Sequence, residues 1–220
     1  DVALCPPSVY LSAVVAAAEG STIGVGAQNV YHEAKGAFTG ELSVAMLADV
    51  GCQYAILGHS ERRHILGESN ADVCRKVHAT LAGGLTPIVC VGETLQEREA
   101  GKTNDIVGEQ ILGSLAGLSN AQAAKLVVAY EPVWAIGTGV NAEPADAERV
   151  HAALRNLLAF RFGGDAAAAI RIQYGGSVSG SNAQELLGQE NIDGALVGGA
   201  SLDAEKFVPV IQAAVAHAKS

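Results

Sequence analysis

The chain has 220 residues, of which 49% are hydrophobic, and it carries a formal net charge of −9 at pH 7. This length suits one large domain, and α/β barrels commonly reach it as a single domain. No stretch approaches the roughly 18 uninterrupted apolar residues that a membrane span needs. The acidic balance, without a basic run, argues against a nucleic-acid partner. An anionic substrate would therefore be held by local dipoles against the global field.

Short apolar segments alternate with helical patterns along the whole chain. The expected strands are 2–5, 22–27, 54–58, 86–91, 126–130, 170–174 and 194–197. The expected helices lie near 8–18, 41–50, 70–82, 103–115, 144–160, 181–187 and 203–217. Strands that are apolar on both faces are typical of a parallel sheet covered by helices. Capping signals at Ser69 and Ser181, and Pro144 in a first helical turn, support three of the helix starts.

The first residues and the cysteines carry expectations about processing and location. The chain opens at Asp1 directly into an apolar strand, without Met or a signal-peptide pattern, which favours a lost or separate upstream segment. Cys5 and Cys90 fall inside apolar strands, and the cysteines show no metal-like spacing. Buried, reduced thiols in a cytoplasmic protein are therefore expected, with no metal.

Polar or glycine residues follow five of the strands, which distinguishes between two parallel-sheet folds. His59, Glu93 and Glu131 each come at or just after a strand end, and glycine pairs follow the last two strands. Active-site loops at the carboxyl ends of many strands are typical of a (β/α)8 barrel. A doubly wound sheet would concentrate function at one switch point, and its Gly-x-Gly-x-x-Gly turn is absent after the first strand. The barrel is favoured, as one domain over residues 1–220.

Glu131 ends an apolar strand and is followed at once by a loop suited to closing over a site. Pro132 and Gly137-Thr138-Gly139 read as two hinges on either side of the apolar tip 133–136. A general base under a lid that excludes water is one interpretation. An ordinary β-to-α turn with an incidental Glu is the other.

Two further patterns complete the candidate site. The run 58–63 places His59 after a strand, where it could donate to a carbonyl or enediolate oxygen, with Glu61 or the arginines beside it. The same pattern also fits a structural or surface imidazole. Gly175-Gly176-Ser177 and Gly198-Gly199 offer unobstructed N–H groups, which suits a phosphate group, although tight turns need glycine too.

Taken together, these segments resemble triosephosphate isomerase, in the family's order from residue 1 to 220. The resemblance rests on Glu131 with its loop, Gly58-His59-Ser60-Glu61-Arg62-Arg63, Tyr174-Gly175-Gly176-Ser177-Val178, Ala195-Leu196-Val197-Gly198-Gly199-Ala200, Gly26-Ala27-Gln28-Asn29 and Gly36-Ala37-Phe38-Thr39-Gly40-Glu41. It implies a TIM barrel that interconverts dihydroxyacetone phosphate and glyceraldehyde 3-phosphate through an enediolate, without metal or organic cofactor.

The resemblance also assigns roles to individual residues. It implies Glu131 as the base and His59 as the neutral electrophile and proton shuttle, as in the acid–base tuning known for this family. Glu61 would be a supporting carboxylate, and Cys90 a packing residue. The phosphate donors would be Gly137, Ser177, Gly198 and Gly199. The loop with Phe38 and Thr39 would insert beside a partner subunit, which implies a homodimer.

One part of the family pattern has no counterpart in this sequence. The expected fold is a TIM barrel lacking its first βα unit, because the family's Asn-x-Lys strand is not found and seven βα units remain. Lys35 is the one loop lysine that could substitute for the missing cation. Impaired turnover follows unless a separate N-terminal fragment supplies that unit. The alternative function is an inactive TIM-like module that binds a phosphorylated ligand or a partner.

Overall fold

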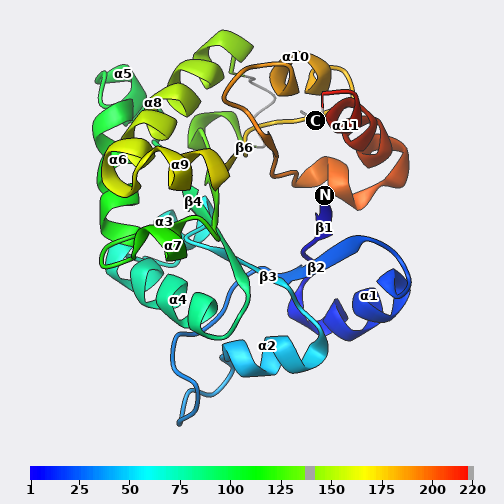
Figure 1. Ribbon diagram of the computed structural model, residues 1–220. Helices are drawn as coiled ribbons and strands as arrows, with labels where there is room; N and C mark the ends of the chain where they lie inside the picture. Colours follow the sequence, from blue (N-terminus) through cyan, green and yellow to red (C-terminus); the bar gives the residue numbers. More distant parts are fainter. Residues whose placement is uncertain (137–141, 218–220) are drawn as a thin grey trace. The chain divides into compact units, whose positions relative to one another are not determined.

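The computed structural model describes residues 1–136 and 142–217 (Figure 1). The chain divides into two compact units. The first unit comprises Asp1–Cys90 and Leu112–Val127, and the second comprises Val91–Ile111 and Val128–Ser220. The expectation of a single domain over residues 1–220 stays a prediction.

Parallel strands with short registers build the first unit. Val2 pairs with Ile23, and Tyr54 pairs with Thr86. The strands are β1 (Val2–Leu4), β2 (Ile23–Ala27), β3 (Tyr54–Leu57) and β4 (Thr86–Val91), and they neighbour one another in that order. β3 and β4 are buried along nearly their whole length, because helices cover the parallel sheet.

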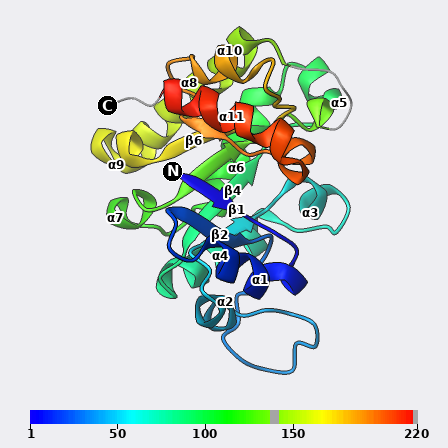
Figure 2. The same ribbon diagram turned by 90° about the vertical axis from the view of Figure 1, so that its right-hand side faces the viewer.

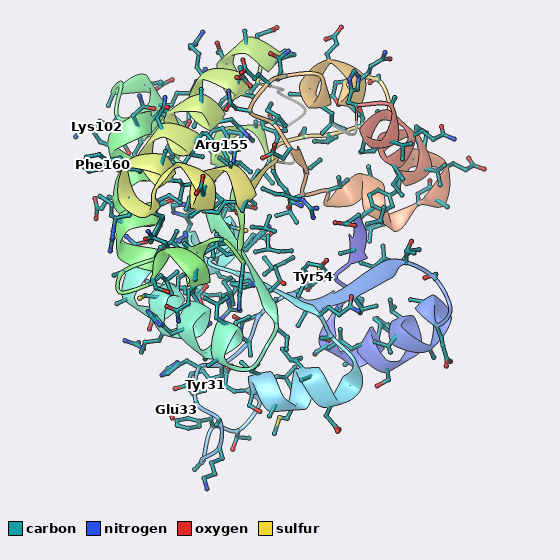
Figure 3. The ribbon with its side chains drawn as sticks, in the orientation of Figure 1. Tyr31, Glu33, Tyr54, Lys102, Arg155 and Phe160 are labelled. Carbon is teal, nitrogen blue, oxygen red and sulfur yellow. The ribbon has the colours of Figure 1, made fainter. Side chains whose placement is uncertain are left out.

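The helices of the first unit are η1 (Ser8–Tyr10), α1 (Leu11–Ala18), α2 (Val44–Val50), α3 (Ser60–His64), α4 (Asn70–Ala82) and α7 (Asn120–Ala123). Four of them, α2, α3, α4 and α7, begin directly after a residue whose side chain caps the helix. Ser69 and Asp72 form a complete capping box at the start of α4, as the sequence predicted. A long loop from Gln28 to Ser43 projects beside α2 (Figures 1 and 2), with Tyr31 and Glu33 on it (Figure 3).

The second unit continues the alternation of strand and helix. Gln173 of one strand pairs in parallel with Gly194 of the next. The strands are β5 (Val127–Tyr130), β6 (Arg171–Tyr174) and β7 (Gly194–Ala195). The helices are α5 (Leu95–Glu99), α6 (Thr103–Ser114), η2 (Val133–Ala135), α8 (Pro144–Phe162), α9 (Gly164–Ala169), α10 (Ala183–Leu187), η3 (Gly199–Leu202) and α11 (Ala204–Ala216). Every segment predicted as a strand thus contains one.

One predicted helix start is wrong, and the reason is local. α10 begins after Asn182 and not after Ser181. The Asn182 side chain instead accepts from the Ser179 backbone N–H at 2.8 Å, so it caps the turn before the helix. Pro144, by contrast, stands in the first turn of α8 as predicted. Among the described helices, none combines the length and the apolar character that crossing a bilayer requires.

Candidate active site

His59 stands where β3 ends and α3 begins, at the N-cap of that helix. Gly58 before it has φ +67°, a conformation that favours glycine and turns the chain sharply. The His59 ring Nδ1 accepts from the backbone N–H of Glu61 at 3.4 Å. In a neutral ring, an accepting Nδ1 leaves the proton on Nε2. The local geometry therefore supplies an imidazole suited to donate from Nε2.

Arg63 fixes the backbone on which His59 stands. Its guanidinium donates to the carbonyl of Gly58 at 2.8 Å and to that of Cys90 at 3.0 Å. It also donates to the Asn70 side chain at 2.7 Å. One side chain thus links the ends of β3 and β4 to the first turn of α4. The two arginines beside His59 thus have different partners: Arg63 donates to backbone carbonyls and to Asn70, and Arg62 forms an ion pair with Glu68.

The carboxylate of Glu61 is mostly solvent-exposed, at 71%, and lies 3.7 Å from His59 Nδ1. The direct support that Glu61 gives to the ring is its backbone N–H. Arg62 pairs with the buried carboxylate of Glu68 at 3.3 Å, and buried Lys76 pairs with the same carboxylate. Lys76 also donates to Asn29 at 2.8 Å, which ties the loop after β2 to α4.

In the second unit, Glu131 directly follows β5 and has only 2% of its surface exposed. Its backbone N–H donates to the Val91 carbonyl at 2.7 Å. Two glycines lie in close contact with Glu131. A Cβ on Gly92 would lie 1.7 Å from the Glu131 carbonyl oxygen, and a Cβ on Gly175 would lie 2.9 Å from Glu131 Cγ. Gly175 is itself held by a 2.7 Å hydrogen bond to the Tyr130 carbonyl. The backbone and the side-chain stem of Glu131 are therefore closely constrained.

A buried carboxylate, Glu93, organises the segment after Glu131. The Tyr130 hydroxyl donates to its Oε1 at 3.1 Å, and the Trp134 indole donates to the same atom at 3.0 Å. Burial and then the Glu93 charge raise the pKa of Tyr130, so the phenol stays a donor. The start of the expected lid is thereby fixed: Val133, Trp134 and Ala135 form η2.

The predicted phosphate-binding residues of the second unit lie in two loops. The Ser177 hydroxyl donates to the Ala135 carbonyl at 2.8 Å, and the Asn182 amide donates to the Ser177 carbonyl at 3.0 Å. A Cβ on Gly198 or Gly199 would meet no atom within 4 Å among the residues that the structure describes. Their backbone N–H groups at the start of η3 are suited to an anion. Gly137 lies outside the described residues.

Phe38 and Thr39 are exposed on the projecting loop of the first unit. The Phe38 ring packs on Tyr31 of the same loop, with ring centroids 4.7 Å apart. Gly36 has φ +146°, and a Cβ there would meet the Phe38 ring at 2.5 Å. Lys35, on the same loop, is exposed. Cys90 is fully buried, in agreement with its predicted packing role, and all four cysteines are free thiols.

Sequence reasoning missed three supporting residues, Glu93, Arg98 and Gln110. Glu93, like Glu131, follows an apolar strand. Its position supported the prediction of a barrel fold, but no role at the site was predicted for it. Arg98 and Gln110 lie on helices, and no local pattern distinguishes them from surface residues. Their roles depend on contacts between segments far apart in the sequence, which spacing alone does not reveal.

An imidazole and a buried carboxylate, each next to a strand end, and glycine turns suited to an anion are typical of barrel enzymes. A sequence model of the triosephosphate isomerase family matches residues 1–214. A triosephosphate isomerase from Rhodopirellula baltica is 58% identical over 97% of this chain and 84% of its own length. Those from Chloroflexus aurantiacus and Moorella thermoacetica are 54% and 56% identical, each over 96% of this chain and 84% of the relative.

The chain belongs to the triosephosphate isomerase family. It is therefore an isomerase with the α/β TIM-barrel fold, as the resemblance implied.

Proposed function

We propose that the protein interconverts dihydroxyacetone phosphate and glyceraldehyde 3-phosphate through an enediolate. The observation that carries this proposal is the buried, closely constrained Glu131 in a chain of the triosephosphate isomerase family. Glu131 removes the proton from the carbon beside the carbonyl and returns it to the neighbouring carbon. A carboxylate held rigidly and apart from water is suited to this transfer.

His59 polarises the substrate carbonyl and moves a proton between the two enediolate oxygens. Its Nδ1 accepts from the Glu61 backbone, which supports a neutral ring that donates from Nε2. Glu61 serves as the supporting residue beside the ring. A neutral donor suits the reaction because its own acidity is close to that of the enediol.

The substrate phosphate is bound by backbone N–H groups of Gly198 and Gly199, together with Ser177 and Gly137. The space around Gly198 and Gly199, which no described residue outside their own chain neighbours fills within 4 Å of a Cβ, supports this assignment. The Ser177 hydroxyl donates to the Ala135 carbonyl in this structure. Donation to a phosphate oxygen would replace that hydrogen bond. Backbone dipoles can hold the phosphate despite the net charge of −9.

A coupled assay of triose interconversion tests the reaction, using the protein beside Glu131→Gln and His59→Gln. General acid–base groups contribute about 10²–10⁴-fold each, so each variant should lose at least about a hundredfold in kcat. Glu109→Gln, an exposed carboxylate on α6, is the control and should keep the wild-type rate. A wild-type rate no higher than that of Glu131→Gln would support the inactive-module alternative.

The phosphate assignment has its own test. Inorganic phosphate should inhibit competitively, and Ser177→Ala should weaken that inhibition while it raises KM more than it lowers kcat. Ser21→Ala is the control, because the exposed Ser21 hydroxyl also donates to a backbone carbonyl, that of Ala18, but in the first unit and outside the proposed phosphate-binding loops. Equal phosphate inhibition of Ser177→Ala and the wild type would remove Ser177 from the site.

The protein is proposed to act as a cytoplasmic homodimer, with the loop of Phe38 and Thr39 at the interface. Exposure of both residues on a projecting loop supports this. Thr39→Arg should shift the sedimentation velocity toward that of a monomer. Phe160→Arg is the control, since Phe160 is 90% exposed and lies on α8 of the second unit (Figure 3). An unchanged dimer in Thr39→Arg would exclude this loop as the interface.

A further inference from the structure

We infer that Gln110 is a positioning residue for Glu131, acting through the backbone of Gly92. This inference rests on the proposed role of Glu131 as the base. Gln110 lies on α6, and its side-chain amide makes two hydrogen bonds to one residue. Its Oε1 accepts from the Gly92 N–H at 2.7 Å, and its Nε2 donates to the Gly92 carbonyl at 3.0 Å.

Gly92 transmits this constraint directly to Glu131. A Cβ at Gly92 would lie 1.7 Å from the Glu131 carbonyl oxygen and 2.6 Å from its carbonyl carbon, so the two backbones are in close contact. Val91, the neighbour of Gly92, accepts from the Glu131 N–H at 2.7 Å. Both peptide groups of Glu131 therefore adjoin the two residues at the end of β4.

The opposite side of Glu131 is confined as well. Gly175 stands where a Cβ would meet Glu131 Cγ at 2.9 Å and the Tyr130 carbonyl at 3.2 Å. Gly92 and Gly175 thus confine Glu131 from two sides. A shift of Gly92 would therefore displace Glu131 or loosen its packing. A displacement near 1 Å at a reacting group can cost about a hundredfold in rate. The carboxylate position is thus sensitive to the position of Gly92.

The side-chain amide of Gln110 forms hydrogen bonds with both the N–H and the carbonyl of Gly92. Gly92 lies just beyond β4, and it offers one N–H donor and one carbonyl acceptor. At neutral pH the amide of Gln provides an acceptor and a donor side by side at fixed spacing. A Met side chain has a similar length but forms neither hydrogen bond. An ionised Glu can accept from the Gly92 N–H, but its other oxygen is repelled by the Gly92 carbonyl. Protonated Glu can again form both bonds.

Steady-state kinetics and urea unfolding of Gln110→Met provide the test, with Glu109→Met, an exposed position on the same helix, as the control. We expect kcat to fall about 10- to 100-fold with KM changed by less than about twofold. A purely structural role would lower stability and leave kcat of the folded protein within about twofold of the control. That result would overturn the inference.

A double variant separates this inference from the proposed function. If Gln110 acts through Glu131, Gln110→Met should change the residual rate of Glu131→Gln by less than about twofold, because the base is already absent. If Gln110→Met lowers the residual rate of Glu131→Gln by the same factor as it lowers the wild-type rate, the inference is overturned and the proposed function is unaffected. If Glu131→Gln keeps the wild-type rate, the proposed function fails, and the inference fails with it.

Gln110→Glu gives a second reading that does not depend on how well Gln110→Met folds. A carboxylate facing the Gly92 carbonyl is destabilised, so its pKa should rise. The ratio of its kcat to the wild-type kcat should therefore increase from pH 8 to pH 5.5, as the carboxyl group gains a proton and donates to Gly92. A ratio that does not change with pH would contradict the positioning role.

Discussion

The guanidinium carbon of Arg98 lies 4.3 Å from the centre of the Trp134 ring. The indole N–H of Trp134 donates to Glu93, and Arg98 lies 3.9 Å from the same carboxylate oxygen. Trp134 is therefore held by its ring face and by its N–H at once. Arg98 also reaches Asp146 in the first turn of α8 at 2.8 Å. The segment that follows Glu131 is thus joined to two helices through one arginine.

Replacement of Arg98 should destabilise the second unit more than replacement of a neighbouring arginine. Arg98→Met removes the cation–π contact and leaves buried Glu93 without this nearby positive charge. We expect the free energy of unfolding to fall by about 1–3 kcal/mol, as measured in urea. Arg149→Met is the matched control, because Arg149 pairs with Asp146 too but is 73% exposed. Its effect should stay within about 0.5 kcal/mol. Equal effects of the two variants would contradict the role of Arg98.

The Glu93 carboxylate should matter more for its hydrogen bonds than for its charge. Glu93→Gln keeps an oxygen that can accept from Tyr130 and Trp134, whereas Glu93→Leu removes this acceptor from the buried Tyr130 hydroxyl and the half-buried Trp134 indole. Each unsatisfied donor costs about 1–3 kcal/mol, so Glu93→Leu should be the more destabilising variant. The chain has one tryptophan, so its fluorescence reports directly on Trp134. The emission of Glu93→Leu should shift to longer wavelength. A shift as large in Glu93→Gln would argue that charge dominates.

The sequence predicted the strands well because a buried parallel sheet leaves a strong local signal. The core strands are continuous runs of apolar and β-branched residues, and β4 was predicted with the bounds it has. α4 was also predicted from residue 70 to 82, because its capping box and helical period agree. α3, α5, α7 and α9 were not predicted, since helices of four to six residues carry too few turns for a period to show.

The candidate site was predictable only where its chemistry follows a strand directly. Glu131 and His59 were identified from that position and from the family resemblance. Gln110 could not be, since its partner Gly92 is 18 residues away and the contact uses backbone atoms. The buried state of Glu93 was equally hidden, because the hydroxyl and the indole that satisfy it lie 37 and 41 residues away. Such contacts depend on packing between segments, and no local pattern encodes them.

His151 should make stability depend on pH. It is fully buried on α8, and its Nδ1 lies 3.2 Å from the Asn191 carbonyl, so Nδ1 carries the proton and Nε2 has no partner among the described residues. Burial lowers its pKa from 6.5 to about 4, against opposing contributions from Asn191, Glu148 and Asp193. The unfolded chain therefore binds a proton at a higher pH than the native protein does.

The sign of the effect follows from linkage. Stability from neutral His151 is fully present above about pH 6.5 and is lost as pH falls toward the native pKa of about 4. The full difference amounts to about 3 kcal/mol. Urea unfolding of His151→Phe, which keeps a ring but does not titrate, should show a shallower loss between pH 6.5 and 4.5 than the wild type. Parallel curves would rule out His151 as the titrating group.

Gly92 should tolerate no side chain, whereas Gly108 on α6 should tolerate one. A Cβ on Gly92 would overlap the backbone of Glu131, at 1.7 Å from its carbonyl oxygen. Gly92→Ala should therefore cost more than about 4 kcal/mol of unfolding free energy, or prevent folding. Gly108→Ala is the matched control, because its nearest contact would be an ordinary 3.7 Å from a Leu157 methyl group. Alanine within a helix should there add up to about 1 kcal/mol. Thermal unfolding of both variants measures the difference, and a stable Gly92→Ala would show that the end of β4 can move away from Glu131.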